Sequence, residues 1–396
     1  MRILFVHNRY LIRAGEDAVW ESEQRLLIER GHKVITYTHD NREIPRLSSL
    51  RIGLRAVWSA NDYSAIRESI RQYRPDVVAI HNFFPLISPA VYYAARAEKA
   101  PVVQTLHNYR LLCLGSYLYR DGKLCEDCLG KLAPWPGILH GCYRQNRVAS
   151  SGVAAMLTAH KALNTWRRMV DVYVALTDFE RMKFIEGGLP AEKIVVKPNF
   201  ALLDPGVGKG EGKYALYVGR LSPEKGLDTM IAAWQELGQL IPLKIVGDGA
   251  LAGRVTEAAS KNPGIEYLGE KSRAEVAEMI KGASFLIFPS RWYEGLPMII
   301  IESYASGTPV IASKLGSMNS LIEHGRTGLH FRPGDVVDLI NQVKWAVSHP
   351  AEIEAMRGYA RDEFEANYTA DRNYEALMNV YDMALKRASG QSFEPL

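Results

Sequence analysis

Two glutamates stand at a helix-compatible spacing in FPSRWYEGLPMIIIESYASGTPVIAS, residues 288–313. Glu294 lies in a polar loop after an apolar run, and Glu302 follows about two helical turns later. Carboxylate oxygens accept hydrogen bonds from vicinal hydroxyl groups, which a ribose and a hexose both present. The spacing therefore predicts one carboxylate at each end of a ligand the size of a nucleotide sugar. The alternative for Glu302 is an exposed helical residue, although its apolar neighbours would make an unpartnered carboxylate costly.

The loop between these glutamates leads into a predicted helix. Pro297 suits the first helical turn, where the missing N–H costs nothing, and Gly307 ends the helix. The free N–H groups and the positive dipole end at Leu296, Pro297 and Met298 predict a binding site for a diphosphate. Gly295 lets the backbone approach that ligand closely.

Arg220 and Lys225 follow a predicted strand in YVGRLSPEKGLD, residues 217–228. Two cations fixed on a strand-end loop would stabilise a leaving pyrophosphate, because its negative charge grows as a glycosidic bond breaks. The sequence predicts that both side chains contact a diphosphate. Solvated surface charges are the alternative.

A glycine turn and three histidines are further candidates. The segment VGDGALAG, residues 246–253, places Gly247 in a G-x-G-x-x-A pattern, which alone suggests dinucleotide binding. No acidic residue follows the next strand at the usual distance, so NAD binding is disfavoured. His107, in QTLHNYR, ends a strand and is either a ligand contact or a hydrogen-bonded structural histidine. His7 and His81 also end strands and are interpreted as structural.

All cysteines of the chain lie in one insertion, residues 108–147. They are Cys113, Cys125, Cys128 and Cys142. Their spacing, C-x11-C-x2-C-x13-C, is compatible with a tetrahedral structural zinc site, in which His140 could replace one thiolate. A long irregular insertion in a compact domain is usually stabilised, for example by a bound metal, or has a function of its own. Reduced thiols and disulfides are the alternatives, and a cytosolic setting disfavours disulfides.

Short apolar, β-branched runs alternate with helical patterns in both halves of the chain. In the first half the runs are Ile3–Val6, Val34–Tyr37, Val77–Ile80, Val102–Leu106, Val172–Leu176 and Ile194–Val196. In the second half they are Ala215–Val218, Leu243–Val246, Ile265–Leu268, Phe285–Phe288, Pro309–Ala312 and Leu329–Phe331. Strands separated by helices imply parallel sheets with right-handed crossovers. Each half is therefore predicted to be a doubly wound α/β domain.

The segment LLDPGVGKGEGK is rich in glycine and lacks apolar periodicity, so residues 201–213 are predicted to be a flexible linker. It separates a domain over residues 1–200 from a domain over residues 214–371. A C-terminal helix at about residues 372–396 is expected to pack back on the first domain. Ligands of open α/β sheets bind outside the carboxyl ends of the strands, so two facing domains would place the site in a cleft.

Composition excludes several classes of protein. The chain has 396 residues, of which 47% are hydrophobic and 23% charged, and this composition argues against disorder, collagen and coiled coil. No apolar run approaches the roughly 18 residues of a membrane span, and the first residues do not form a signal peptide. We expect a cytoplasmic, globular protein.

Charge is divided unevenly along the chain. Residues 1–200 carry 28 basic and 19 acidic side chains, whereas residues 201–396 carry 20 and 25. The basic half suits an anionic partner such as a phosphorylated substrate or a membrane surface. Arg46, Arg51 and Arg55 lie among apolar residues in PRLSSLRIGLRAVW, residues 45–58, a pattern that can lie on anionic lipid. An ordinary solvated surface is the alternative, and no motif supports nucleic-acid binding.

The pattern G-R-L-x-x-x-K-G, residues 219–226, followed by E-x7-E from Glu294 to Glu302, resembles family 4 of the retaining GT-B glycosyltransferases. The resemblance covers essentially the whole chain and is strongest over residues 214–332. It implies a GT-B fold of two Rossmann-like domains facing a cleft, with the acceptor on the first domain and the nucleotide-sugar donor on the second.

The resemblance also implies roles for single residues. Glu302 would hold the ribose and Glu294 the transferred sugar, while Arg220 and Lys225 would bind the diphosphate. His107 matches the histidine that contacts the donor sugar, and the turn at Gly247 would line the nucleotide pocket. Gly15, in RAGED, would bring backbone amides to the phosphates; the family has Gly-Gly where this chain has Ala14-Gly15.

The implied activity is transfer of a hexosyl group from a UDP- or GDP-linked donor with retention at the anomeric carbon. The resemblance implies no protein general base and no divalent cation at the donor, and the chain has no D-x-D motif. A glycan or lipid-linked acceptor of cell-surface polysaccharide biosynthesis, at the cytoplasmic face of the membrane, is the hypothesis for the second substrate. The alternatives are a nucleotide-sugar epimerase or hydrolase on the same fold, and a non-catalytic assembly scaffold.

Overall fold

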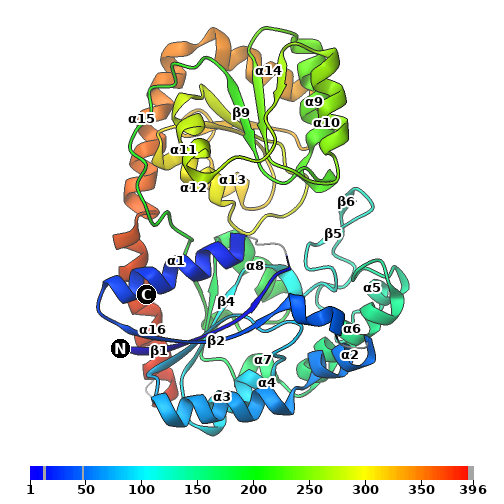
Figure 1. The fold of residues 1–396 in the computed structure, drawn as a ribbon, viewed down its shortest axis with the longest axis vertical. Helices are drawn as coiled ribbons and strands as arrows, with labels where there is room; N and C mark the ends of the chain where they lie inside the picture. Colours follow the sequence, from blue (N-terminus) through cyan, green and yellow to red (C-terminus); the bar gives the residue numbers. More distant parts are fainter. Residues whose placement is uncertain (12–14, 47–48, 391–396) are drawn as a thin grey trace. The chain divides into compact units, whose positions relative to one another are not determined.

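The computed structural model describes residues 1–11, 15–46 and 49–390 (Figure 1). These residues form two compact units. Unit 1 comprises Met1–Leu118, Cys125–Asn199 and the chain from Asn373 onward; unit 2 comprises Tyr119–Leu124 and Phe200–Arg372.

Unit 1 is built on a six-stranded parallel sheet with the order β2-β1-β3-β4-β7-β8. The strands are β1 (Arg2–Arg9), β2 (Lys33–Asp40), β3 (Val77–Asn82), β4 (Val102–Leu106), β7 (Val172–Ala175) and β8 (Ile194–Val196). All six strands predicted for this half are present. β1 continues three residues past its apolar run, so His7 lies within the strand and not after it.

Helices flank this sheet (Figure 1). They are α1 (Gly15–Glu29), α2 (Ser49–Val57), α3 (Ala60–Tyr73), α4 (Ala90–Ala97), α5 (Trp135–Leu139), α6 (Arg147–Ala162), α7 (Thr165–Arg168), α8 (Asp178–Glu186) and α16 (Ala370–Ala388). α16 buries Leu377, Val380 and Tyr381 in the same core as Ile3 and Phe5 of β1, so this C-terminal helix packs on unit 1. The last residues, 391–396, lie outside the described part of the chain.

Unit 2 repeats the architecture with the strand order β11-β10-β9-β12-β13-β14. Its strands are β9 (Ala215–Val218), β10 (Leu243–Val246), β11 (Ile265–Tyr267), β12 (Phe285–Phe288), β13 (Val310–Ser313) and β14 (Gly328–Phe331), all parallel. The six strands predicted for the second half are therefore also confirmed. The helices are α9 (Leu227–Leu237), α10 (Ala252–Lys261), α11 (Arg273–Gly282), α12 (Met298–Ala305), α13 (Met318–Leu321), α14 (Val336–Ser348) and α15 (Pro350–Asn367).

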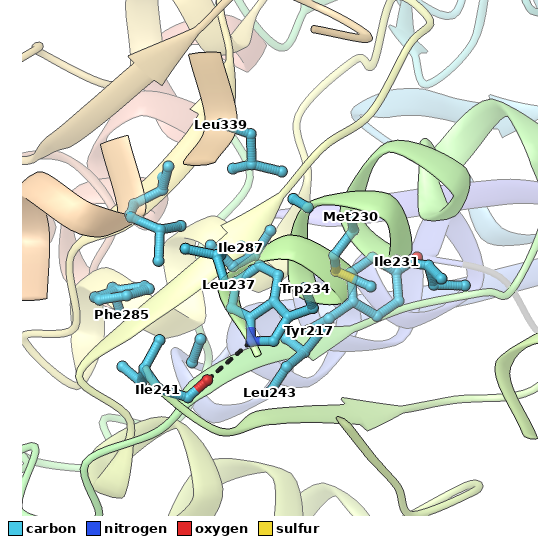
Figure 2. Close-up of a cluster of buried hydrophobic side chains, with 14 of the residues drawn as sticks. Tyr217, Met230, Ile231, Trp234, Leu237, Ile241, Leu243, Phe285, Ile287 and Leu339 are labelled. Atoms are coloured by element: carbon cyan, nitrogen blue, oxygen red, sulfur yellow. Dashed lines mark hydrogen bonds between the residues drawn. The ribbon is translucent and has the colours of Figure 1, made fainter. Parts of the chain in front are cut away.

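The core of unit 2 is centred on Trp234 of α9, which is fully buried (Figure 2). Its ring packs among Met230, Leu243 and Phe285, and its Nε1–H donates to the Ile241 carbonyl at 2.9 Å. The indole thus buries a large apolar surface without leaving its donor unpaired. This core anchors the sheet whose strand ends carry the predicted diphosphate residues.

The glycine-rich segment predicted to be a flexible linker is held against unit 2. Its backbone N–H groups at Gly208, Gly210 and Gly212 donate to carbonyls of Ser306, Lys281 and Gly282 at 2.9–3.0 Å. The Arg357 guanidinium donates to the Gly208 carbonyl at 2.7 Å. These bonds run along the backbone and leave no side-chain signature, so composition alone suggests more freedom than the structure shows.

Each sheet has one switch point, where the chain reverses its direction of winding. It lies between β1 and β3 in unit 1 and between β9 and β12 in unit 2. Ligands of open α/β sheets bind beyond the carboxyl ends of the strands at such points. The loops after these four strands are therefore the expected ligand-binding positions.

Candidate functional site

A buried ion pair occupies the switch point of unit 2. Lys225 Nζ lies 2.7 Å from Glu294 Oε1, and the same oxygen accepts hydrogen bonds from Ser290 Oγ and Trp292 Nε1, each at 2.7 Å. Glu294 is 6% exposed. The ammonium also lies 5.7 Å from the centroid of the Phe288 ring and 5.4 Å from that of Trp292. Because one oxygen takes all three bonds, Oε2 is left available for another donor.

Arg220 belongs to the same loop but is more exposed. Its guanidinium donates to Glu224 Oε1 at 3.0 Å, and its side chain is 55% exposed. Ser222 Oγ donates to the same Glu224 oxygen at 2.6 Å, which fixes the carboxylate. A cation held at one end and open to solvent at the other can take an additional anionic partner.

Two glycines bring the backbones of this site together. Gly226 has φ +73°, and a Cβ there would lie 1.9 Å from the Pro289 carbonyl oxygen, so only glycine lets the Lys225 turn meet the loop after β12. Gly247 has φ +133°, and its Cβ would lie 2.0 Å from the Gly219 carbonyl oxygen. The glycine turn after β10 therefore holds the loop that carries Arg220, a packing role that the nucleotide-binding interpretation did not include.

We expect Gly247→Ala to lower the free energy of unfolding by roughly 2–4 kcal/mol, because it combines a forbidden φ with a backbone clash. The matched control is Gly253→Ala on α10, where a Cβ meets nothing within 4 Å, and there the change should be neutral or slightly stabilising. Denaturant unfolding of the two variants tests this. Equal stability of both would mean that the loop moves aside without cost.

The Glu302 carboxylate, on the fifth residue of α12, has no partner among the described residues. It is half-buried, and burial raises the pKa of its carboxyl group while the Arg273 charge acts in the opposite direction. Pro297 caps α12 without a side-chain hydrogen bond to the first turn. A desolvated carboxylate beside an uncapped helix start can accept hydroxyl donors at the carboxylate and hold an anion at the helix start.

The unit 1 switch point gathers three histidines. His107 Nε2 lies 2.9 Å from His81 Nδ1, and His7 Nε2 lies 2.8 Å from Asp17 Oδ1. Burial lowers the pKa of both His81 and His107 well below their ordinary value. The structure thus brings His107 together with two histidines that the sequence left as structural, and spacing along the chain could not have revealed this.

The predicted phosphate loop is described from Gly15 onward, and Ala14 lies outside the described residues. Gly15 is exposed and begins α1. Burial raises the pKa of the neighbouring Glu16 to about 8. Glu16 Oε2 accepts from Tyr10 Oη at 2.9 Å and from Asn108 Nδ2 at 3.2 Å. A carboxyl group neutral near pH 7 does not repel an anion at this helix start.

Two models of known protein families match the chain. The model of the "Glycosyltransferase Family 4" matches residues 24–203, and that of "Glycosyl transferases group 1" matches residues 204–363. The chain belongs to glycosyltransferase family 4.

Similar proteins include an uncharacterised glycosyltransferase, MJ1178, of Methanocaldococcus jannaschii, which is 30% identical over 44% of this chain and 49% of its own length. Glycogen synthase of Mycobacterium tuberculosis is 25% identical over 81% of this chain and 72% of its own. Among solved structures, Anabaena HepE in complex with UDP superposes on this chain with a TM-score of 0.68 and 16% sequence identity. The match covers 96% of this chain and 100% of HepE. The fold is therefore GT-B.

All four cysteines of this glycosyltransferase are partly exposed. Among the residues that the structure describes, no three His, Cys, Asp or Glu side chains are arranged to hold a metal ion, and the zinc site stays a prediction. Burial raises the pKa of the Cys128 thiol to about 11, and the other three cysteines lie close enough to raise it further. The insertion also carries a hairpin, β5 (Tyr119–Arg120) and β6 (Lys123–Leu124), and the helix α5.

Not every arginine of the basic segment, residues 45–58, is in a position to contact lipid. Arg55 points inward: its Nε donates to the Leu86 carbonyl at 2.6 Å and its Nη2 to Asp62 at 3.2 Å. Arg55 is therefore a structural residue, a correction to the sequence interpretation. Arg51 is exposed, and the side chain of Arg46 lies outside the described residues.

None of the helices described for the enzyme has the length and apolarity that crossing a membrane requires.

Proposed function

We propose that this glycosyltransferase moves a hexosyl group from a UDP- or GDP-linked donor to a glycan or lipid-linked acceptor in cell-surface polysaccharide biosynthesis, with retention of configuration. The observation that carries the proposal is the Lys225–Glu294 pair at the switch point of unit 2. A cation and a carboxylate with a free oxygen stand together there, and Glu302 follows on the next helix. HepE, which shares the fold, was solved with UDP.

In this proposal, each site residue binds a particular part of the donor. Arg220, Lys225 and the backbone at Leu296–Met298 hold the diphosphate, Glu302 the ribose, and Glu294 Oε2 a hydroxyl of the transferred sugar. Gly15 brings amides to the phosphates, and His107 contacts the sugar. The anomeric carbon loses its bond to the phosphate oxygen and gains one to the acceptor oxygen on the same face, while the acceptor proton moves to the departing phosphate. No protein base and no metal ion is assigned to this step.

Thermal unfolding with UDP, GDP, ADP and NAD tests the proposal. A ligand present at 100 times its dissociation constant stabilises the protein by about 2.7 kcal/mol. A shift with one nucleoside diphosphate identifies the base of the donor. A shift with NAD alone, or with none of the four, would reject the proposal. Product analysis with the corresponding nucleotide sugar then separates transfer from hydrolysis or epimerisation, because only transfer depends on an added acceptor.

We further propose that unit 1 associates with an anionic membrane surface. Residues 44–61 and 128–170 contain no carboxylate and nine basic residues, and they supply the packed helices α2, α5 and α6. The close contact between Gly53 of α2 and Gly152 of α6 joins the two segments. Large apolar side chains are exposed on the same elements: Leu54 (64%), Trp135 (55%), Leu139 (55%) and Val148 (78%). Exposed apolar residues on elements that carry basic and no acidic side chains suit anionic lipid.

The double substitution Leu139→Glu with Val148→Glu should weaken binding to phosphatidylglycerol vesicles at least about tenfold, because two apolar contacts are lost and two negative charges added. Sedimentation with vesicles measures this. The control is Val337→Glu on α14 of unit 2, which is 61% exposed and should leave binding unchanged. Equal binding of all three proteins, or equal binding of the wild type to uncharged phosphatidylcholine vesicles, would contradict the proposal.

A further inference from the structure

A chain of buried polar side chains leads from the interior of unit 1 to His107. Lys197 Nζ lies 2.7 Å from Glu23 Oε1. The other carboxylate oxygen, Oε2, lies 3.4 Å from His81 Nε2, and His81 Nδ1 lies 2.9 Å from His107 Nε2. Lys197 and Glu23 are each 1% exposed and His81 is 3% exposed. None of these three side chains has a role in the transfer step described above.

The contact between the two imidazoles is an in-plane hydrogen bond. Their rings are 22° from parallel and the centroids are 5.1 Å apart, a separation that agrees with ring nitrogen atoms that meet at 2.9 Å. One nitrogen must therefore carry the shared proton, and there are two ways to place it between His81 Nδ1 and His107 Nε2.

The position of the Glu23 carboxylate determines which of the two nitrogens carries the shared proton. If His81 carried its proton on Nδ1, the bare lone pair of Nε2 would face a carboxylate oxygen 3.4 Å away in a buried site. With the proton on Nε2, a positive N–H edge faces that oxygen, and Nδ1 is free to accept. The Lys197 ammonium forms an ion pair with the other oxygen of this carboxylate at 2.7 Å. The buried charge therefore places the His81 proton on Nε2.

We propose that Lys197, Glu23 and His81 are positioning residues that hold His107 as the Nε2–H tautomer. His107 Nε2–H donates to His81 Nδ1, so the remaining nitrogen, Nδ1, has a lone pair and no proton. Nδ1 makes no hydrogen bond to any described residue. His107 then accepts a hydrogen bond from a hydroxyl of the transferred sugar and does not donate one. This last step rests on the proposed function; the tautomer does not.

The tautomer is tested without substrate by 15N NMR of the imidazole side chains, with the His107 signals assigned by their loss in His107→Gln. The expected result in the wild type is a neutral ring protonated at Nε2 only. In the double variant Glu23→Gln with Lys197→Met, a neutral amide replaces the carboxylate and can donate to His81 Nε2. The proton preference should then be lost, and a form of His107 protonated at Nδ1 should appear.

The same double variant should lower kcat/KM for the nucleotide sugar by about 10- to 100-fold while leaving the dissociation constant of the nucleoside diphosphate unchanged. The control is Asp171→Asn, which also removes a buried carboxylate of unit 1, but one that binds the Val102 N–H at the opposite end of β4. Asp171→Asn should alter the stability of the protein but neither the tautomer of His107 nor kcat/KM. His81→Asn, whose amide can present an N–H to His107, provides a second variant if the double variant does not fold.

A wild-type His107 protonated at Nδ1 or at both nitrogens would overturn the proposal. So would a tautomer that persists in the double variant and in His81→Asn. If the tautomer and its loss are as expected but no nucleotide sugar is turned over, the proposed function fails and the proton placement stands. If turnover is found and kcat/KM is the same in every variant, the hydroxyl contact to His107 Nδ1 is wrong.

Discussion

Lys225→Ala is expected to lower kcat/KM by about 10²- to 10³-fold, the loss that follows removal of one preorganised charge donor. Lys225 is held in place by the Gly226 turn, by Glu294 at 2.7 Å and by the faces of Phe288 and Trp292. A cation so fixed needs no reorganisation when the diphosphate gains charge. We therefore expect kcat to fall more than KM rises.

Steady-state kinetics with the donor identified by thermal unfolding measures this loss. The control is Lys261→Ala on α10, whose side chain is 69% exposed and paired with Glu257 of the same helix, and it should leave kcat/KM unchanged. Removal of Lys225 also leaves the buried Glu294 without its cation, so a lower melting temperature accompanies the loss of activity. A folded Lys225→Ala protein with wild-type kcat/KM would exclude Lys225 from the reaction.

Glu302→Ala is expected to move two measurements in opposite directions. Nucleoside diphosphate binding should weaken by about 100-fold, because two hydrogen bonds from the ribose to a charged acceptor are lost. The free energy of unfolding without ligand should stay equal or rise, because the half-buried carboxylate has no described partner to compensate its desolvation.

The direction of the change in the free energy of unfolding follows from the raised pKa of Glu302. A group with a raised pKa in the folded state contributes stability below its unfolded pKa, and this contribution is lost as the pH rises through the folded value. Above the folded pKa, the ionised carboxylate is therefore a cost that alanine removes. Isothermal titration and thermal unfolding at pH 7.5 provide both numbers, with the exposed Glu257→Ala of α10 as control. A destabilised apo protein with unchanged affinity would make Glu302 a structural residue.

The sequence by itself was enough to locate all twelve strands of the two sheets. An apolar β-branched run and the glycine or polar residues that end it are properties of neighbouring residues, so they can be read locally. The same is true of the loop with Arg220 and Lys225 and of the helix with Glu302, because each is a short segment whose spacing is preserved in the fold. Glu294 and Lys225 could be predicted together only through the family resemblance.

Tertiary structure alone decided which distant residues meet. Lys197 and Glu23 are 174 residues apart along the chain, yet they form an ion pair. Glu23 also reaches His81, and the strand order places β3, with His81, beside β4, which leads to His107. The same long-range packing turned Arg55 inward onto Asp62. A side chain's partner, and with it its charge and tautomer, depends on the register and order of the strands, which no local pattern encodes.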